Sequence, residues 1–530
     1  MEVFENHFKK LANKDGVVEG NATHNSVTDE RLNALFSNEE VRVMLGTLKH
    51  KQNKKGGADF IINELLINCP DHMIPIFTDF FNLILVSGFV PEAWTTGIVV
   101  PLHKEGPKEN PDNYRGITLL SCLGKLFTRL LNRRLKAFID SQGGISEAQV
   151  GFREGYSTID HIFTLHMLIK LYISRKGKKL YLAFVDFKKA FDLVDRSILW
   201  RKLIDKGMSG RILNIVQTIY QNTKLKVRLN GTTTNSFSSN IGVLQGEILS
   251  PLLFAIFLDD FEPFLASHFP EAPADPMVKK KGNDRELDVF LKLYVLLYAD
   301  DSILIAESER ALQEGLNALE SYCKLNNIIV NTDQSKEKTK VMICSRAKPR
   351  TIPNFTYGND PIEVVFQYTY LGIRFNYNGE FHVAIAKRIE LGRAAMFGLI
   401  RKINILGLTL ETQIELFERT VLPVALYGCE VWGGSDLRQL EAFQTQFFKY
   451  VLKLARFTPS CMVLGETGRM NLKSMIRTRM LSYWSRLING PQRKIAFLVY
   501  SKERRYHENN EKKFSSKWLD EIKKCSSGHQ

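Results

Sequence analysis

Cysteine is scarce in this sequence, and its few copies are not spaced for a shared site. The seven cysteines among 530 residues stand singly, and no CxxC pair occurs. This pattern gives no support to a zinc knuckle or a disulfide framework. We therefore expect a reduced, intracellular protein, in the nucleus, the cytoplasm or both.

Long apolar runs are also missing. No stretch of about 20 apolar residues occurs, so no membrane-spanning helix is expected. The opening residues, MEVFE, hold acidic side chains and no apolar core, so no signal peptide is expected.

The composition is that of a folded and strongly basic protein. Hydrophobic residues make up 44% of the chain and charged residues 24%, which predicts several packed domains. The formal net charge of +15 and the pI of about 9.3 favour a polyanionic partner, either a nucleic acid or a membrane surface. The alternative is a protein that is merely basic.

Two adjacent aspartates, Asp300 and Asp301, separate apolar runs at 293–298 and 302–305. Each run is rich in Val, Ile, Leu and Tyr, so we expect two buried strands with the hairpin tip at 299–300 or 300–301. Two carboxylates so close repel each other, and a bound divalent cation commonly offsets this repulsion. A solvated turn is the other interpretation, because Asp is a common turn residue.

A second apolar run, 181–185, ends at Asp186. A carboxylate at the end of this strand could complete a three-carboxylate site. Such a site holds two metal ions that clamp the attacking and leaving oxygens of a phosphoryl transfer. The nearby Asp192 and Asp195 are expected to cap the following helix rather than to bind metal.

These stretches resemble the palm motifs of reverse transcriptases. FVDFKKAFD, with Asp186, resembles motif A, and YADD, with Asp300 and Asp301, resembles motif C. Further blocks occur in the family's order: a strand ending near Lys104, NYRGI with Arg115, QVGFR with Phe152 and Arg153, LQGEILSP with Gln245 and Gly246, and YLG at Tyr370, Leu371 and Gly372. Over roughly residues 38–480, the resemblance is to polymerases of non-LTR (LINE-type) retrotransposons.

Two positions differ from the residues usual in the family's sequence motifs. Gly116 stands where the fingers motif usually has proline, which is expected to loosen the loop but to leave Arg115 in register. Glu247 stands where a small residue or cysteine is common. In the same motif B block, Ser250 and Pro251 fit the cap and first residue of a helix.

The text resembling motif D is longer than usual. Residues 334–337 look inserted, so Lys336, Lys338 and Lys340 compete for the role of the general acid that protonates the pyrophosphate leaving group. We favour Lys338.

The resemblance implies an α+β right-hand polymerase, with fingers, a palm built on an antiparallel sheet, and an all-helical thumb. The expected segments are a linker or remnant at 1–37, fingers with template-contacting helices at 38–175, the palm at 176–378, helical thumb and downstream helices at 379–490, and a charged tail at 491–530. We expect this tail to be loosely packed, with Trp518 as its anchor.

The implied function is RNA-directed DNA synthesis by two-metal nucleotidyl transfer, adding dNTPs to a primer 3′-OH. The implied catalytic residues are Asp186, Asp300, Asp301 and Lys338. Two Mg²⁺ ions, or Mn²⁺ in their place, would be held at Asp186, Phe187, Asp300 and Asp301. The nucleotide would contact Lys104, Arg115, Phe191, Gln245 and Gly246, and the template and primer Phe152, Arg153, Tyr370, Leu371 and Gly372. Phe191 stands at the steric gate that excludes a 2′-OH, although a plain core phenylalanine is the alternative.

The expected partners are an RNA template, a DNA primer and dNTPs, with no membrane. Such polymerases usually follow an endonuclease domain, and this chain begins just before the fingers. We therefore expect either a truncated open reading frame or a fragmentary gene model, and an endonuclease that acts in trans is a possible further partner. A catalytically silent nucleic-acid-binding relic is the main rival, whereas the large aromatic Phe191 disfavours an RNA-dependent RNA polymerase.

Overall fold

The computed structural model describes residues 1–14, 29–50, 56–104, 106–174, 177–268, 295–333, 338–508 and 517–526. They form two compact units. Unit 1 comprises Met1–Phe152, Phe187–Phe264 and Glu320–Val330, and unit 2 comprises Arg153–Asp186, Leu265–Leu319 and Asn331–Gln530. Each unit is therefore assembled from segments that are distant in the sequence.

A small mixed sheet forms the scaffold of unit 1. Its strands are β1 (Thr96–His103), β2 (Tyr114–Leu119), β4 (Lys224–Leu229), β5 (Thr232–Thr233) and β6 (Phe237–Ser238). The order is β2-β1-β4-β5, and β6 also pairs with β4. Strand β1 runs antiparallel to β2 and parallel to β4, so β2 lies at the edge of the sheet.

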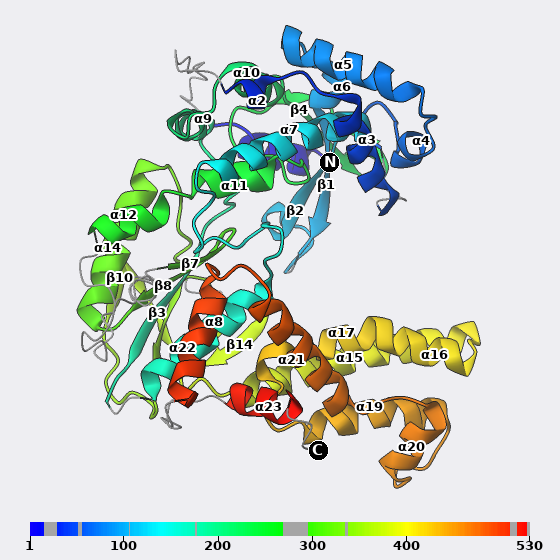
Figure 1. The fold of residues 1–530 in the computed structure, drawn as a ribbon, viewed down its shortest axis with the longest axis vertical. Helices are drawn as coiled ribbons and strands as arrows, with labels where there is room; N and C mark the ends of the chain where they lie inside the picture. Colours follow the sequence, from blue (N-terminus) through cyan, green and yellow to red (C-terminus); the bar gives the residue numbers. More distant parts are fainter. Residues whose placement is uncertain are drawn as a thin grey trace. The chain divides into compact units, whose positions relative to one another are not determined.

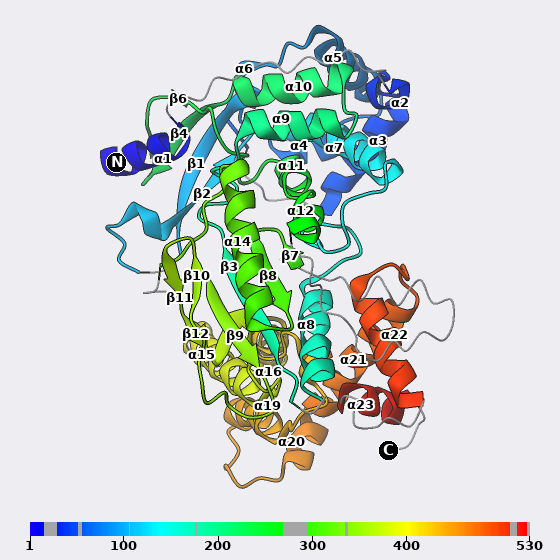
Figure 2. The same cartoon turned by 90° about the vertical axis from the view of Figure 1, so that its left-hand side faces the viewer.

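Helices make up most of the rest of unit 1 (Figures 1 and 2). They are α1 (Glu2–Leu11), α2 (Glu30–Asn33), α3 (Asn38–Gly46), η1 (Thr47–His50), α4 (Asn63–Ile67), α5 (Met73–Ser87), α6 (Glu92–Thr95), η2 (Pro111–Asn113), α7 (Cys122–Ser141), α9 (Arg196–Asp205), α10 (Gly210–Gln221) and α11 (Ser250–Phe257). Helix α7 illustrates why they form. Ser121 caps its first turn by accepting from Gly124 N at 2.9 Å. Its apolar face, which includes Phe127 and Leu131, is fully buried.

The central sheet of unit 2 has the order β12-β9-β3-β8-β7, and Figure 2 shows its main strands side by side. Its strands are β3 (Leu180–Asp186), β7 (Val295–Tyr298), β8 (Asp301–Ala306), β9 (Lys340–Cys344) and β12 (Val364–Val365). The pairs are antiparallel except β12 with β9, so the expected antiparallel palm sheet is confirmed. Two hairpins complete the strands: β10 (Phe355–Tyr357) with β11 (Asp360–Ile362), and β13 (Gln367–Tyr370) with β14 (Ile373–Asn376).

Beyond β14 the described chain is helical, as the sequence predicted. After α8 (Thr158–Ile173), which lies earlier in the chain, the helices of unit 2 are α15 (His382–Leu406), α16 (Leu410–Leu416), the π turn η3 (Phe417–Val421), α17 (Leu422–Ala425), α18 (Cys429–Trp432), α19 (Arg438–Val451), α20 (Ser460–Thr467), α21 (Leu472–Ile488), α22 (Ile495–Glu508) and α23 (Lys517–Ser526). Figure 1 shows α15, α17 and α19 side by side. Helices α12 (Phe261–His268) and α14 (Glu309–Leu325) each contain residues of both units.

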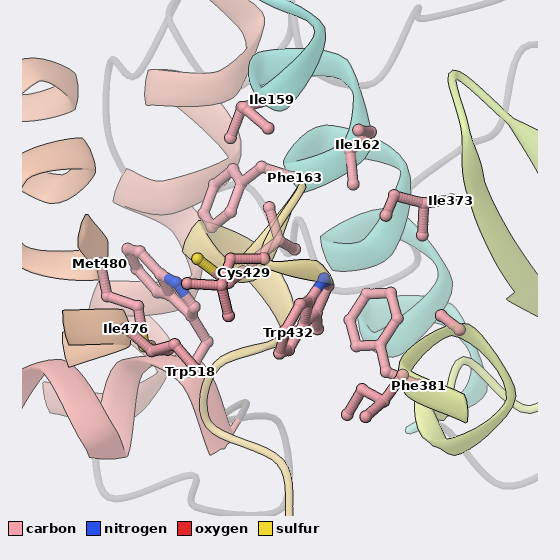
Figure 3. Close-up of a cluster of buried hydrophobic side chains, with 14 of the residues drawn as sticks. Ile159, Ile162, Phe163, Ile373, Phe381, Cys429, Trp432, Ile476, Met480 and Trp518 are labelled. Carbon is pink, nitrogen blue, oxygen red and sulfur yellow. The ribbon is translucent and has the colours of Figure 1, made fainter. Parts of the chain in front are cut away.

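The described part of the C-terminal tail, 491–508 and 517–526, packs into the core of unit 2. Figure 3 shows Trp518 facing Phe163 of α8, with the ring centroids 4.8 Å apart. The Trp518 side chain is 2% exposed, and its Nε1 donates to Glu430 O at 2.6 Å. Trp518 is thus an anchor, as predicted, but the prediction of a loosely packed tail is wrong. Leu519 and Ile522 join Trp518 on one helical face, and this local spacing outweighs the charge of the segment.

None of the helices in the described ranges is long and apolar enough to cross a membrane.

Candidate active site

Asp186 and Asp301 face each other across two neighbouring strands of unit 2. Strand β3 pairs antiparallel with β8, and Asp186 is the direct partner of Asp301. Directly opposed residues of such a pair point to the same face of the sheet. The strands anchor them well, because Phe184 and Ile303, which are also partners, are at most 1% exposed. The sheet thus brings two carboxylates together at one end.

Asp300 lies in the turn that precedes Asp301. Tyr298 pairs with Asp301, so Ala299 and Asp300 form a two-residue turn, the first of the two expected positions. Ala299 has a φ of 55°, in the left-handed region that a non-glycine residue rarely adopts. Such a conformation costs roughly 1–3 kcal/mol. The buried strands on both sides hold this turn, and with it Asp300, next to the facing pair.

Asn331 holds Asp186 through both backbone and side chain. Its Nδ2 donates to Asp186 Oδ2 at 3.0 Å, and its backbone N donates to Asp186 O at 2.8 Å. Asp186 N in turn donates to Thr339 Oγ1 at 3.2 Å. The sequence alone did not indicate a role for Asn331, although this asparagine begins the segment that resembles motif D. These bonds fix the orientation of the carboxylate.

The lysines of the motif D text have different surroundings. Lys338 Nζ lies 3.5 Å from Asp186 Oδ2, and both side chains are about a quarter exposed. Lys340 is buried and lies 2.7 Å from Glu363 Oε2. Lys336 lies outside the described residues. The backbone of Lys338 is held in place, because Tyr368 OH donates to Lys338 O at 3.0 Å.

In unit 1, three side chains form a hydrogen-bonded chain. Arg115 Nε donates to Gln245 Oε1 at 2.8 Å. Gln245 Nε2 then donates to both carboxylate oxygens of Asp192, at 3.1 and 3.0 Å. Burial raises the pKa of Asp192 to about 6, although the bond from Gln245 and the charges of Lys189 and Arg115 oppose the rise.

The prediction that Asp192 caps a helix is therefore wrong, whereas Asp195 does cap one. Asp195 Oδ1 accepts from Ser197 N at 3.0 Å and from Ile198 N at 3.3 Å at the start of α9. Asp192 instead receives Gln245, which lies 53 residues further along the chain. A contact over that separation leaves no local pattern in the sequence.

Gly246 lets the motif B loop lie directly against β2. Its φ is 114°, and a Cβ there would lie 2.7 Å from Thr118 O. Thr118 N donates to Gln245 O at 2.8 Å, so the loop is bonded to the strand that carries Arg115. Only glycine combines this φ with this approach. Lys104 is exposed just beyond β1, and its backbone N donates to Asn113 O at 2.8 Å.

The two residues that differ from the family's motifs, Gly116 and Glu247, each have a structural effect. Gly116 lies within β2, paired with Pro101, so the expected loosened loop is not observed. Glu247 is 6% exposed, burial raises its pKa, and its Oε2 accepts from Leu249 N and from Ser250 N at 3.1 Å. Helix α11 begins at Ser250, so the predicted capping role of Ser250 is wrong, and the Glu247 side chain takes it.

Phe191 belongs to an aromatic stack in unit 1. It is 8% exposed and lies parallel to Phe254, with the centroids 4.4 Å apart and an interplanar angle of 19°. Phe152 meets its edge at 5.9 Å. Phe152 itself is 61% exposed and has a φ of 61°. Packing in the core is enough to explain the burial of Phe191. Its role as a steric gate therefore stays a prediction.

The remaining predicted contacts lie in unit 2. The Arg153 guanidinium lies 4.3 Å from the ring centroid of Tyr156. Leu371 and Gly372 form the turn between β13 and β14, with φ values of 45° and 77°. Tyr370 is buried and its hydroxyl lies 3.1 Å from His161 Nδ1. Burial, with the charge of Asp301 as a smaller cause, raises the pKa of Tyr370 well above its usual value.

Comparison with known proteins decides the family. The sequence model described as "Reverse transcriptase (RNA-dependent DNA polymerase)" matches residues 103–375, just over half of the chain. The chain belongs to the reverse transcriptase family. The matched stretch contains every residue predicted above to act in catalysis, metal binding, nucleotide binding or template and primer contact.

Several relatives of this chain come from mobile elements. The "Probable RNA-directed DNA polymerase from transposon X-element" of Drosophila melanogaster is 25% identical over 78% of this chain and 43% of its own length. The corresponding protein "from transposon BS" of the same fly is 28% identical over 75% of this chain and 43% of its own length. The R2 polyprotein of Popillia japonica is 28% identical over 66% of this chain and 46% of its own length. The chain thus spans less than half the length of these relatives.

Among solved structures, apo telomerase from Candida tropicalis is similar at 12% identity and a TM-score of 0.38, covering 81% of this chain and 74% of that chain.

The carboxylates at the end of the unit 2 sheet suit a hard divalent cation in their chemistry. Aspartate oxygens are the ligands that Mg²⁺ prefers, and like charges opposed on adjacent strands, as at Asp186 and Asp301, repel each other. Within the described ranges, no three His, Cys, Asp or Glu side chains are gathered so that they could hold a metal ion. The facing pair Asp186 and Asp301 nevertheless has the donor chemistry for such an ion, and Asp300 lies one residue before Asp301 on the turn.

Proposed function

We propose that this chain is an RNA-directed DNA polymerase of the non-LTR retrotransposon type, which adds dNTPs to a primer 3′-OH on an RNA template. The observation that carries the proposal is the direct pairing of Asp186 with Asp301 beside Asp300. Membership of the reverse transcriptase family and relatives named as transposon polymerases support it.

In this proposal, Asp186, Asp300 and Asp301 hold two Mg²⁺ ions, or Mn²⁺, with Phe187 beside them. Ions held there would supply a lowered pKa at the primer hydroxyl and charge neutralisation on the triphosphate. Asn331 fixes the orientation of the Asp186 carboxylate. Lys338 Nζ, which is already at the carboxylate, donates a proton to the pyrophosphate oxygen as it leaves.

Unit 1 supplies the nucleotide contacts. Arg115, with Lys104, holds the β and γ phosphates by charge-assisted hydrogen bonds. Gln245 orients the Arg115 guanidinium, and Asp192 fixes Gln245. Gly246 keeps the loop against β2, and Phe191 excludes the 2′-OH of a ribonucleotide.

Template and primer contacts follow from exposed or turn positions. Phe152 is exposed, and Arg153 carries a positive charge, so both suit a nucleic-acid strand. The turn formed by Leu371 and Gly372, next to Tyr370 at the end of β13, contacts the primer. Base pairing supplies the sequence specificity, so the protein needs only to bind backbone and shape.

The test is Mg²⁺-dependent extension of a DNA primer on an RNA template by the purified chain. We expect extension with dNTPs and its loss in Asp300→Asn, with the affinity for primer–template little changed. Asp205→Asn, on an exposed carboxylate of α9, is the matched control and should extend normally.

Two outcomes would contradict the proposal. If Asp300→Asn lost primer–template binding as well as extension, the catalytic assignment of Asp300 would be refuted. No extension by a folded wild-type chain that binds primer–template tightly would establish the silent nucleic-acid-binding relic instead.

A further inference from the structure

Helix α1 contacts the segment on both sides of Arg115. The ring of Phe4 meets the ring of Tyr114 edge-on, with the centroids 4.9 Å apart. His7 Nδ1 lies 3.9 Å from Asp112 Oδ1. These residues and Phe8 are spaced by three and four positions, so they share one face of the helix.

Phe8 occupies the place that a side chain at position 116 would take. A Cβ built on Gly116 would lie 2.6 Å from Phe8 Cε1 and 2.9 Å from Val99 Cγ1. Phe8 is 5% exposed, so the ring is almost fully enclosed there. A larger residue at 116, such as the proline of the resembling motif, would displace this ring. Gly116 and Phe8 are therefore complementary.

The residues that follow α1 are hydrogen-bonded to the segment that leads into motif B. Asn13 Nδ2 donates to Ser238 O at 2.8 Å, and Lys14 N donates to Asn240 Oδ1 at 3.0 Å. Asn240 N donates back to Ala12 O at 3.0 Å. The helix is thus held at both ends against the elements that carry Arg115 and Gln245.

Arg115 lies on a strand that needs such support. Strand β2 is at the edge of its sheet and pairs with β1. Asp112, which His7 approaches, also forms an ion pair at 2.9 Å with Lys189 of motif A. Contacts from α1 therefore reach two sequence blocks that the nucleotide site uses.

We propose that α1 is a brace that positions Arg115 for the incoming triphosphate, with Phe4, His7 and Phe8 as positioning residues. The inference rests on the proposed function, because it gives Arg115 the phosphate-binding role. It adds that residues 2–14 form part of the nucleotide site without touching the nucleotide.

The test compares Phe8→Ala with Val3→Ala in the full chain. Val3 is on the same helix but 63% exposed, so its variant is the matched control. A small displacement of a binding group has a large kinetic effect, so Phe8→Ala should raise KM for dNTPs about tenfold while kcat changes little. Gly116→Val alone should impair the enzyme in the same way, and adding Phe8→Ala should restore part of the loss by making room.

Hydrogen exchange gives a second measurement that does not need activity. Backbone amides of residues 112–119 should exchange faster in Phe8→Ala than in wild type or Val3→Ala. If Phe8→Ala folds poorly, Phe8→Leu replaces it and should show smaller changes in the same direction.

The outcomes separate the two proposals. If wild type extends primers but Phe8→Ala matches Val3→Ala in KM and in exchange, the brace is refuted and the polymerase stands. If wild type does not extend primers, the proposed function fails, and the brace, which rests on it, is refuted with it.

Discussion

Replacing Asp192 with asparagine is expected to make unit 1 more stable at high pH relative to wild type. The Asp192 carboxyl is largely buried beside Gln245, and burial raises its pKa to about 6 from an ordinary 3.8. Because the folded pKa is raised, the favourable contribution of this group is complete below about pH 3.8 and is lost as the pH rises through about 6. Asparagine does not ionise, so the variant avoids this loss.

The size of the effect follows from the two pKa values. Each pH unit between them corresponds to about 1.36 kcal/mol, so the difference between about 6 and 3.8 amounts to at most about 3 kcal/mol. The advantage of Asp192→Asn over wild type should therefore grow by up to about 3 kcal/mol between pH 4 and pH 8. Any effect of the asparagine amide on stability that does not depend on pH cancels in the difference between the two pH values.

Native-state hydrogen exchange at both pH values can measure this change. Peptides from α9 and α10 report on unit 1, which contains Asp192. Asp205→Asn, on the exposed end of α9, is the matched control. Equal pH dependence in Asp192→Asn and wild type, or a variant advantage that shrinks as the pH rises, would refute the assignment of a raised pKa to this carboxyl.

Three further predictions concern other parts of the molecule. Lys338→Ala should lower kcat about 100-fold with primer–template affinity unchanged, in single-turnover extension; an unaltered rate would remove its role as the general acid. Phe191→Val should raise the relative kcat/KM for ribonucleotides, and unchanged sugar discrimination would leave it a core residue. Trp518→Ala should lower the free energy of unfolding of unit 2 by about 3–5 kcal/mol in urea titrations, because it empties a fully enclosed site; a loss below about 1 kcal/mol would contradict the packed tail.

Local patterns in the sequence predicted the elements that local forces determine. The alternation of apolar runs around Asp300 and Asp301 predicted a hairpin, and the hairpin is present with its tip at one of the two expected positions. Asp195 caps α9 because an N-cap depends only on the next three residues. The apolar spacing beyond residue 382 predicted helices for the same reason. These features could be recognised without knowing which segments meet.

Contacts between distant segments were not predictable in this way. Asn331 binds a carboxylate 145 residues earlier in the chain, and Gln245 binds one 53 residues earlier. The clearest case is Gly116, which the sequence suggested would loosen a loop. It lies in a strand, and its missing side chain makes room for Phe8 from the first helix. A glycine gives no sign in the sequence of which group approaches it.

Strained backbone conformations occur within several of the sequence blocks that form the candidate site. Phe152, Lys189, Ala299 and Leu371 are non-glycine residues with φ values between 45° and 61°, and each lies in a block that resembles a polymerase motif. Each such conformation costs roughly 1–3 kcal/mol, and glycine would avoid most of that cost. Glycine would also remove the side chain and loosen the turn that presents its neighbours, such as Asp300 after Ala299. Retaining a side chain at a strained turn is consistent with a requirement for rigid placement there. The buried strands and helices on either side supply the stability that keeps these turns in place.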